Sequence, residues 1–253
     1  MTGSLTVVGL GPGDPGLRAP AATDALATAT DLVGYAPYLD RVLWHEGQTR
    51  HASDNRVELD RAIHALTLAA TGRRVAVVSS GDPGVFAMAS AVFEAVESGP
   101  AAWRALAIEV IPGISAIFAA AARIGAPLGH DFCVISLSDN LKPWDIVLRR
   151  ITVAAEAGFV LGLYNVASRA RPWQLAAALD ALRPILPPAT PVILATAISR
   201  ADESVVIATL AEIDPTQADM RSLVLIGSPE TRLIPRPNAP PFVYTPRRSA
   251  IPA

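Results

Sequence analysis

The amino-acid sequence predicts an α/β protein whose strands form largely parallel sheets. Short runs of β-branched and apolar residues, such as Arg74–Ser79, alternate with longer alanine-rich stretches of helical period. Strands that alternate with helices in this way pair in parallel through right-handed crossovers. The alternation is interrupted at Gly125–Gly129 and then restarts. We therefore place a domain boundary there, which gives domains at 1–124 and 125–234 and a proline-rich tail at 235–253.

The first half of the chain is expected to fold as four βα units. Pro20 suits the first turn of the first helix, because its missing N–H would be unpaired there. Asp54 is a good N-cap for the second helix, which closes at Gly72. The strands are predicted at 5–8, 32–34, 74–79 and 108–111, and the helices at 19–28, 54–72, 85–96 and 114–124.

The second half of the chain repeats the pattern and then adds strands without intervening helices. The segment after Pro235 is rich in proline, so we expect it to be extended over the surface or disordered. The strands are predicted at 132–137, 159–164, 192–196, 205–209 and 223–226, and the helices at 143–155 and 172–182.

Composition and charge narrow the classes of function. The net charge is −2 and no long basic block occurs, which argues against nucleic acid as the main partner. No apolar run reaches the roughly 18 residues that a membrane span requires, and the N-terminus has no basic leader. The single cysteine, Cys133, can form no internal disulfide. We therefore expect a cytoplasmic protein without a membrane segment.

The first predicted strand ends in the loop Gly9–Pro15, which reads GLGPGDP. This loop is not a dinucleotide fingerprint, since its glycines fall at alternate positions and not as G-x-G-x-x-G. Pro12 and Pro15 lack the backbone N–H groups that would face a phosphate, and Asp14 would repel one. The loop therefore suits a cationic or neutral ligand, or else it is a tight turn without a ligand.

Two further loops follow predicted strands and open helices. In Ser79–Phe86, two glycines let a ligand approach the backbone. Asp82 stabilises a positive charge, orients a neighbouring loop, or caps the next helix. In Ile111–Ala116, Ser115 is either a helix cap or a ligand contact. Because ligands bind outside the carboxyl ends of strands in open α/β sheets, these loops form the predicted ligand site.

The three loops together, in this order, resemble the motifs of the tetrapyrrole methylase family: G-x-G-P-G-D, S-G-D-P-x-x-F and P-G-I-S-A. The resemblance extends over Leu5–Leu233. It implies a methyltransferase that uses S-adenosylmethionine (SAM). It also implies a mainly parallel N-terminal sheet, a mixed C-terminal sheet, a ligand cleft between the two domains, and a homodimer.

Further segments resemble one branch of this family, which methylates C17 of the tetrapyrrole precorrin-3B while the ring contracts to precorrin-4. This resemblance implies a place in cobalamin biosynthesis. The alternatives are the counterpart that acts on cobalt-factor III, another tetrapyrrole methylase, an RNA methylase of the same fold, and a non-catalytic SAM-binding module. The segments are Val33–Leu39, Ile135–Trp144, Leu163–Asn165 and Ser168–Leu175.

The family resemblance also assigns residues to the cofactor. It implies contacts from the second and third loops and from the C-terminal domain, with the first loop close by. The implied cofactor residues are Pro12, Ser80, Gly81, Asp82, Val85, Ser115, Ala116, Tyr164, Asn165, Ala197 and Ser222.

The expected chemistry needs no metal on the protein, because the sulfonium of SAM is already an activated electrophile. The sequence agrees, since it has no H-x-x-H or C-x-x-C pair. Ring contraction would need an acid or base, for which the candidates are Asp82, Asp139 and Tyr35. Arginine suits the substrate's carboxylates, because its guanidinium binds them through two hydrogen bonds. The predicted substrate contacts are Gly11, Tyr38, Ser138, Arg169 and Arg171.

Overall fold

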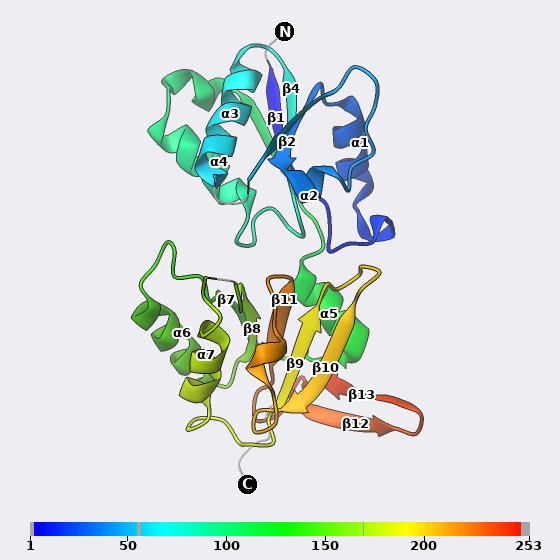
Figure 1. Ribbon diagram of the computed structural model, residues 1–253, viewed down its shortest axis with the longest axis vertical. Helices are drawn as coiled ribbons and strands as arrows, with labels where there is room; N and C mark the ends of the chain where they lie inside the picture. Colours follow the sequence, from blue (N-terminus) through cyan, green and yellow to red (C-terminus); the bar gives the residue numbers. More distant parts are fainter. Residues whose placement is uncertain (1–2, 55–56, 169, 249–253) are drawn as a thin grey trace. The chain divides into compact units, whose positions relative to one another are not determined.

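The computed structural model describes residues 3–54, 57–168 and 170–248 (Figure 1). Its backbone divides into two compact units, which we call unit 1 and unit 2. Unit 1 spans Met1–Ala116 and unit 2 spans Ile117–Ala253. Each unit holds its own sheet and helices, and each is described by itself.

The division falls at the beginning of helix α5 (Ala116–Ile124), whereas the sequence placed it at the end of this helix. Within unit 2, the Ile117 backbone N–H donates a hydrogen bond to the Tyr164 hydroxyl at 2.8 Å. The Ile117 side chain fills the space above Gly162, where a Cβ would lie 2.3 Å from Ile117 Cδ1. These contacts join α5 to the second sheet, and they are not visible in the glycine-rich segment that suggested the boundary.

Unit 1 is built on a five-stranded sheet with the strand order β3-β2-β4-β1-β5. All of its strand pairs are parallel, so the carboxyl ends of all five strands lie at one edge. We call this edge the carboxyl edge of unit 1. The strands are β1 (Ser4–Gly9), β2 (Asp31–Tyr35), β3 (Thr49–Ser53), β4 (Arg74–Ser79) and β5 (Ala107–Ile111).

Helices cover both faces of the unit 1 sheet, with α3 and α4 on one side and α1 and α2 on the other (Figure 1). Side chains of β4 alternate between the two cores: Val75 and Val77 face α3 and α4, while Ala76 and Val78 face α1 and α2. A strand buried on both faces explains the continuous apolar run in the sequence. The helices are α1 (Pro20–Thr28), α2 (Ala36–Leu39), α3 (Glu58–Ala70) and α4 (Met88–Ser98), with 3-10 turns η1 (Pro15–Leu17) and η2 (Ala101–Ala105).

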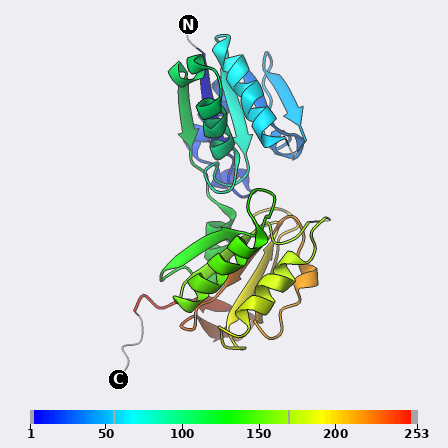
Figure 2. The ribbon, with the colours of Figure 1, turned by 90° about the vertical axis from the view of Figure 1, so that its left-hand side faces the viewer.

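Unit 2 contains a mixed five-stranded sheet with the order β10-β9-β11-β8-β7. Only β7 and β8 pair in parallel, and the other pairs are antiparallel. Helices α6 and α7 pack on the face seen in front of this sheet in Figure 2. The elements are β7 (Phe132–Ser136), α6 (Trp144–Glu156), β8 (Val160–Tyr164), α7 (Gln174–Leu182), β9 (Pro191–Thr196), β10 (Ser204–Thr209), η3 (Pro215–Gln217) and β11 (Ser222–Ile226).

A three-stranded sheet of β6 (Gly125–Ala126), β12 (Arg232–Arg236) and β13 (Ala239–Tyr244) completes unit 2. Strand β13 lies in the segment that the sequence assigned to a separate proline-rich tail. It pairs with β12 and β6, and the Thr245 hydroxyl then donates to the Pro127 carbonyl at 2.6 Å. The part of this segment up to Thr245 is therefore held to unit 2.

The predicted fold class and its alternation of strands and helices are confirmed. Each predicted strand and helix has a counterpart with similar bounds, and β4 has the predicted bounds. The predicted N-cap Asp54 is wrong, because α3 begins at Glu58 with Val57 as its N-cap. The strands and α-helices that the sequence did not indicate are β3, α2, β6, β12 and β13. They are short or carry no clear apolar period, which is the signal that sequence patterns depend on.

Candidate functional site

The first loop (Gly9–Pro15) and the second loop (Ser79–Phe86) of unit 1 meet at the carboxyl edge of its sheet. Gly11 N–H donates to the Gly81 carbonyl at 3.2 Å, and Gly81 N–H donates to the Gly11 carbonyl at 2.9 Å, which makes an isolated antiparallel bridge. Leu10 N–H donates to the Ser79 carbonyl at 2.9 Å just before it. The backbones of these two loops are therefore hydrogen-bonded to each other.

Asp82 joins the second loop to the third loop (Ile111–Ala116). Its Oδ1 accepts a hydrogen bond from Gly84 N–H at 2.8 Å, and its Oδ2 accepts one from Gly113 N–H at 3.0 Å. Both carboxylate oxygens therefore bind backbone groups of the loops. The sequence suggested that Asp82 stabilises a charge, acts as an acid or base, orients a neighbouring loop, or caps a helix, and this geometry makes it a link between two loops.

Glycines allow these loops to approach so closely. A Cβ on Gly113 would lie 2.2 Å from the Gly81 carbonyl oxygen, and a Cβ on Gly9 would lie 2.6 Å from Gly113 N. Gly11 and Gly81 have φ angles of +70° and +66°, a region that other residues rarely adopt. The spacing of the glycines in the sequence thus serves the packing of loop against loop.

Three glycine N–H groups of the loops are not available to a ligand. The N–H groups of Gly11, Gly81 and Gly113 are used within the loops. A cluster of free N–H groups is what binds phosphate, so these three donors cannot take part in a phosphate site. The prolines of the loops, which lack an N–H altogether, are Pro12, Pro15, Pro83 and Pro112.

The other predicted cofactor residues of unit 1 lie on the same three loops. Pro12 and Ser115 are buried, while Ser80 and Val85 are half-buried. Ala116 is the first residue of α5, directly after the third loop. The structure therefore brings these positions together at one edge of the sheet.

Two predicted tyrosines also lie at the carboxyl edge of unit 1. Tyr35 ends β2 and Tyr38 lies in α2, and their rings pack edge to face with centroids 5.2 Å apart. Because β2 is parallel to β4, the last residue of β2, Tyr35, lies at the edge where the second loop begins. Both tyrosines therefore lie at the carboxyl edge of unit 1, which also carries the three loops.

In unit 2, predicted residues gather at the ends of β7 and β8. Asn165 has a φ angle of +55°, and its side-chain amide donates to the Ser136 hydroxyl at 2.8 Å. The same hydroxyl accepts a hydrogen bond from Ser138 N–H at 3.2 Å. Tyr164, which precedes Asn165, accepts the hydrogen bond from α5 described above. These contacts hold Asn165 in a left-handed conformation.

Ala197 and Ser222 lie at the same edge of the unit 2 sheet, where β9 ends and β11 begins. The hydroxyls of Ser222 and Thr196 are 2.7 Å apart, and Asp219 N–H donates to the Ser222 hydroxyl at 2.9 Å. Ala197 is buried with a φ angle of +49°. Because β11 is antiparallel to both β8 and β9, its beginning lies beside the ends of these two strands.

Asp139 and Arg171 form an ion pair in unit 2. Arg171 Nη1 lies 2.5 Å from Asp139 Oδ1 and donates to Asn140 Oδ1 at 2.7 Å. The hydrogen bond from Arg171 lowers the pKa of the Asp139 carboxyl below its ordinary value. The predicted base and the predicted substrate contact therefore partner each other. Arg169, the other predicted substrate arginine, lies outside the described residues.

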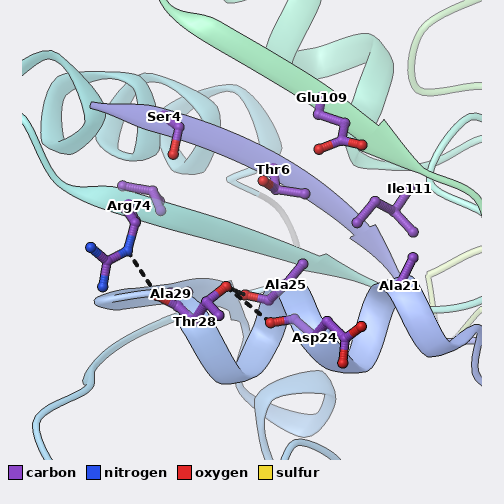
Figure 3. A pocket seen from close by; sticks show the side chains of 11 residues that line it. Ser4, Thr6, Ala21, Asp24, Ala25, Thr28, Ala29, Arg74, Glu109 and Ile111 are labelled. Atoms are coloured by element: carbon purple, nitrogen blue, oxygen red, sulfur yellow. Dashed lines mark hydrogen bonds between the residues drawn. The ribbon is translucent and has the colours of Figure 1, made fainter. Parts of the chain in front are cut away.

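A cavity of about 370 Å³ lies elsewhere in unit 1, between α1 and the strands β1, β4 and β5 (Figure 3). Its polar lining includes Asp24, Arg74 and Glu109, and Arg74 Nε donates to the Thr28 carbonyl at 2.9 Å. None of the predicted ligand residues lines this cavity. The candidate site therefore rests on the geometry of the loops and not on this cavity.

The part of the chain that the structure describes contains no group of three or more His, Cys, Asp or Glu residues that could hold a metal ion. Among the same residues, no helix is both long enough and apolar enough to cross a membrane.

Comparison with known proteins extends these observations. The family model for tetrapyrrole (corrin/porphyrin) methylases matches residues 4–214. The chain is 56% identical over 247 residues to a precorrin-3B C(17)-methyltransferase from Sinorhizobium sp., a match that covers 98% of this chain and 97% of that protein. It is 40% identical over 230 residues to a probable cobalt-factor III C(17)-methyltransferase from Salmonella typhimurium, covering 90% of this chain and 93% of the relative.

The chain also matches a longer relative and solved structures. It is 48% identical over 252 residues to the cobalamin biosynthesis protein CobIJ from Mycobacterium tuberculosis, covering 98% of this chain and 49% of that protein. The crystal structure of the methyltransferase CobJ superposes with a TM-score of 0.91 at 51% identity, covering 96% of this chain and 100% of the other. Uroporphyrin-III C-methyltransferase from Thermus thermophilus, complexed with S-adenyl homocysteine, shares the fold with a TM-score of 0.67 at 21% identity, covering 89% of this chain and 97% of the other.

Proposed function

This chain belongs to the tetrapyrrole (corrin/porphyrin) methylase family, and we propose that it uses SAM to methylate C17 of precorrin-3B, with contraction of the ring to precorrin-4, in cobalamin biosynthesis. The observation that carries the proposal for the cofactor is the joining of three loops by the Gly11–Gly81 bridge and by Asp82. Similarity carries the choice of substrate, since identity is 56% to the precorrin-3B relative and 40% to the cobalt-factor III relative.

The residues of the loops fit a cofactor of this kind. When bound, SAM supplies a methyl group activated by its positive sulfonium. Gly81 carries no side chain, which lets a ligand approach its backbone, and a Cβ there would lie at ordinary contact distance, 3.7 Å from Ser115 Cα. Ser80 directly precedes Gly81 on the second loop, and Ser115 lies against Gly81 from the third loop. The resemblance assigns the remaining contacts to Tyr164, Asn165, Ala197 and Ser222.

For the acid or base of ring contraction we favour Tyr35. Asp82 accepts backbone hydrogen bonds with both oxygens, and Asp139 is paired with Arg171, so each carboxylate already has a structural task. Tyr35 lies at the carboxyl edge of unit 1 and, among the described residues, its hydroxyl has no hydrogen bond. A Tyr35→Phe variant should therefore keep methyl transfer and lose the contracted product.

The test is an assay of the purified protein with SAM and metal-free precorrin-3B, read by mass and by absorbance. We expect a product one methyl group heavier that has the spectrum of a contracted ring. Calorimetry with SAM alone provides the control for cofactor binding. If the protein methylates cobalt-factor III but not precorrin-3B, the proposed substrate is wrong and cobalt-factor III takes its place. Tight SAM binding without turnover of either compound would favour a binding module.

We propose further that the protein is a cytoplasmic homodimer without a protein-bound metal. Family resemblance supports the dimer, and the chemistry of SAM supports the lack of a metal. Light scattering on the purified protein measures whether it is a dimer. Activity that survives a chelator supports the lack of a protein-bound metal. A monomer in solution, or activity restored only by an added metal, would contradict the corresponding part.

A further inference from the structure

We propose that Arg41 is a positioning residue that couples the first loop to the second and thereby sets the affinity for SAM. The effect on SAM rests on the proposed function, whereas the coupling of the loops does not. Arg41 lies just after α2. The structure assigns it a role because its side chain reaches both loops at the Gly11–Gly81 bridge.

The two ends of the Arg41 guanidinium bind different loops. Nη1 donates to the Ser80 hydroxyl at 2.9 Å, and Nη2 donates to the Gly11 carbonyl at 3.0 Å. Only arginine presents several donors in one rigid plane, so one side chain can hold two acceptors at a fixed separation. Lysine carries a single ammonium at the end of a flexible stem and cannot reproduce this geometry.

Arg41 is itself held in place from the first loop side. Arg18, which directly follows η1, donates through Nη2 to the Arg41 carbonyl at 2.9 Å. Arg41 N–H donates to the Tyr38 carbonyl at 3.1 Å. The Arg41 carbonyl is thus bound by the segment that follows the first loop, while the Arg41 side chain binds the first loop itself at Gly11.

The contacts of Arg41 act on the Gly11–Gly81 bridge and on the turn at Gly81. The Gly11 carbonyl accepts from both Gly81 N–H and Arg41, so the arginine adds to the bridge itself. Ser80 immediately precedes Gly81, whose φ angle is positive. Holding Ser80 therefore restrains the residue that leads into the left-handed turn, and the turn keeps its conformation before any ligand binds.

The test compares Arg41→Met, Arg41→Lys and Ser80→Ala with Arg50→Met as the matched control. Arg50 lies close by in sequence, but its guanidinium pairs with Asp40 at the surface and, among the residues that the structure describes, donates to neither loop. In the protein without ligand, amide exchange at Gly11 and Gly81 should be about tenfold faster in Arg41→Met, since hydrogen bonds from a charged group are lost. The Kd for SAM should rise about tenfold, while the KM for precorrin-3B stays within about twofold.

Further comparisons separate positioning from general stability. Arg41→Lys should recover at most part of the SAM affinity, and Arg41→Met combined with Ser80→Ala should cost less than the sum of the two. Unchanged amide exchange in Arg41→Met would overturn the proposal. So would a rise in the KM for precorrin-3B with an unchanged Kd for SAM, because Arg41 would then bind a substrate carboxylate. If the wild type binds no SAM but the exchange effect persists, the coupling stands and the proposed function fails.

Discussion

Gly113 lies so close to Gly81 that a Cβ on Gly113 would be 2.2 Å from the Gly81 carbonyl oxygen. No real Cβ approaches an oxygen so closely, so a side chain at position 113 must displace one of the two loops. Gly9 shares the restriction, because a Cβ there would lie 2.6 Å from Gly113 N. The packing of backbone on backbone at the carboxyl edge of unit 1 therefore depends on these glycines.

Gly113→Ala is expected to weaken SAM binding about tenfold and to destabilise unit 1 by about 1–3 kcal/mol, the usual range for overpacking. The second loop would have to move, which also disturbs the Gly11–Gly81 bridge. Calorimetry with SAM and thermal unfolding measure the two effects. The control is Gly16→Ala, where the new Cβ meets only the exposed side chain of Asp14 at 3.2 Å. Equal effects of the two substitutions would show that loop contact is unimportant.

Asp82→Asn tests whether this carboxylate organises the loops or takes part in the chemistry. Asparagine keeps one acceptor oxygen, so either Gly84 N–H or Gly113 N–H loses its partner, at a cost of about 1–3 kcal/mol. We expect weaker SAM binding with kcat changed less than about threefold at saturating SAM. A fall in kcat of about 10²-fold or more with unchanged SAM affinity would instead identify Asp82 as an acid or base.

The matched control for Asp82 is Asp14→Asn. Asp14 also follows a glycine in a loop of the same edge. Within the described part of the chain, its carboxylate accepts a single hydrogen bond, from Gly16 N–H to Oδ1 at 2.8 Å. An asparagine oxygen can keep that bond. We therefore expect Asp14→Asn to leave SAM affinity close to that of the wild type.

Much of the fold could be predicted because local patterns encode it. Buried strands such as β4 are continuous apolar runs, and α3 has a regular apolar face. Strand β3 was missed because its residues are mostly exposed and polar, and it is held by pairing with β2. The hairpin of β12 and β13 was missed because proline is normally a sign against a strand.

For the candidate site, the sequence indicated where the loops are but not what joins them. The loops could be placed because each follows a buried strand. The partners of Asp82 and Arg41 could not be predicted, since Asp82 binds Gly113 and Arg41 binds Gly11 across long separations in the sequence. The pairing of Asp139 with Arg171 has the same origin. Side chains that bind distant backbone groups leave no periodic signal.

The buried carboxylate of Asp31 predicts a pH dependence of stability. Asp31 is fully buried and is hydrogen-bonded to Thr30 at 2.7 Å, His51 at 2.8 Å and Arg73 at 2.6 Å. Burial by itself raises the pKa of this carboxyl, but the three hydrogen bonds outweigh it and bring the pKa below its ordinary value of 3.8. A lowered pKa in the folded state stabilises the fold above the ordinary value, and this stabilisation is lost as pH falls through the lowered pKa.

Asp31→Asn should therefore lower the free energy of unfolding by about 1–3 kcal/mol at pH 7, because hydrogen bonds to the buried carboxylate are lost while the Arg73 side chain, 44% exposed, can be solvated. The difference from the wild type should shrink as pH falls below about 4. Urea unfolding at several pH values measures it. Asp40→Asn is the control, since Asp40 pairs with Arg50 in an exposed position and should change little. A difference that stays constant with pH would contradict the assignment to the carboxylate charge.

The last prediction concerns the ion pair of Asp139 and Arg171. The hydrogen bond from Arg171 lowers the pKa of Asp139, which makes this carboxylate a weaker base at neutral pH. Asp139→Asn should leave kcat within about threefold. It should also lower the KM for precorrin-3B about two- to threefold, because the Arg171 charge is then free for a substrate carboxylate. Arg171→Gln should raise that KM about tenfold, as expected when a charged hydrogen bond is lost.

Steady-state kinetics with precorrin-3B at saturating SAM measure these changes. Arg183→Gln is the control, because Arg183 pairs with Asp180 at an exposed position on the same unit. If Asp139 were the base of ring contraction, kcat would fall by about 10²–10⁴ in Asp139→Asn with no gain in KM. If Arg171 only stabilised its loop, Arg171→Gln would lower thermal stability and leave the KM unchanged. The direction of the KM change therefore separates a substrate contact from a structural ion pair.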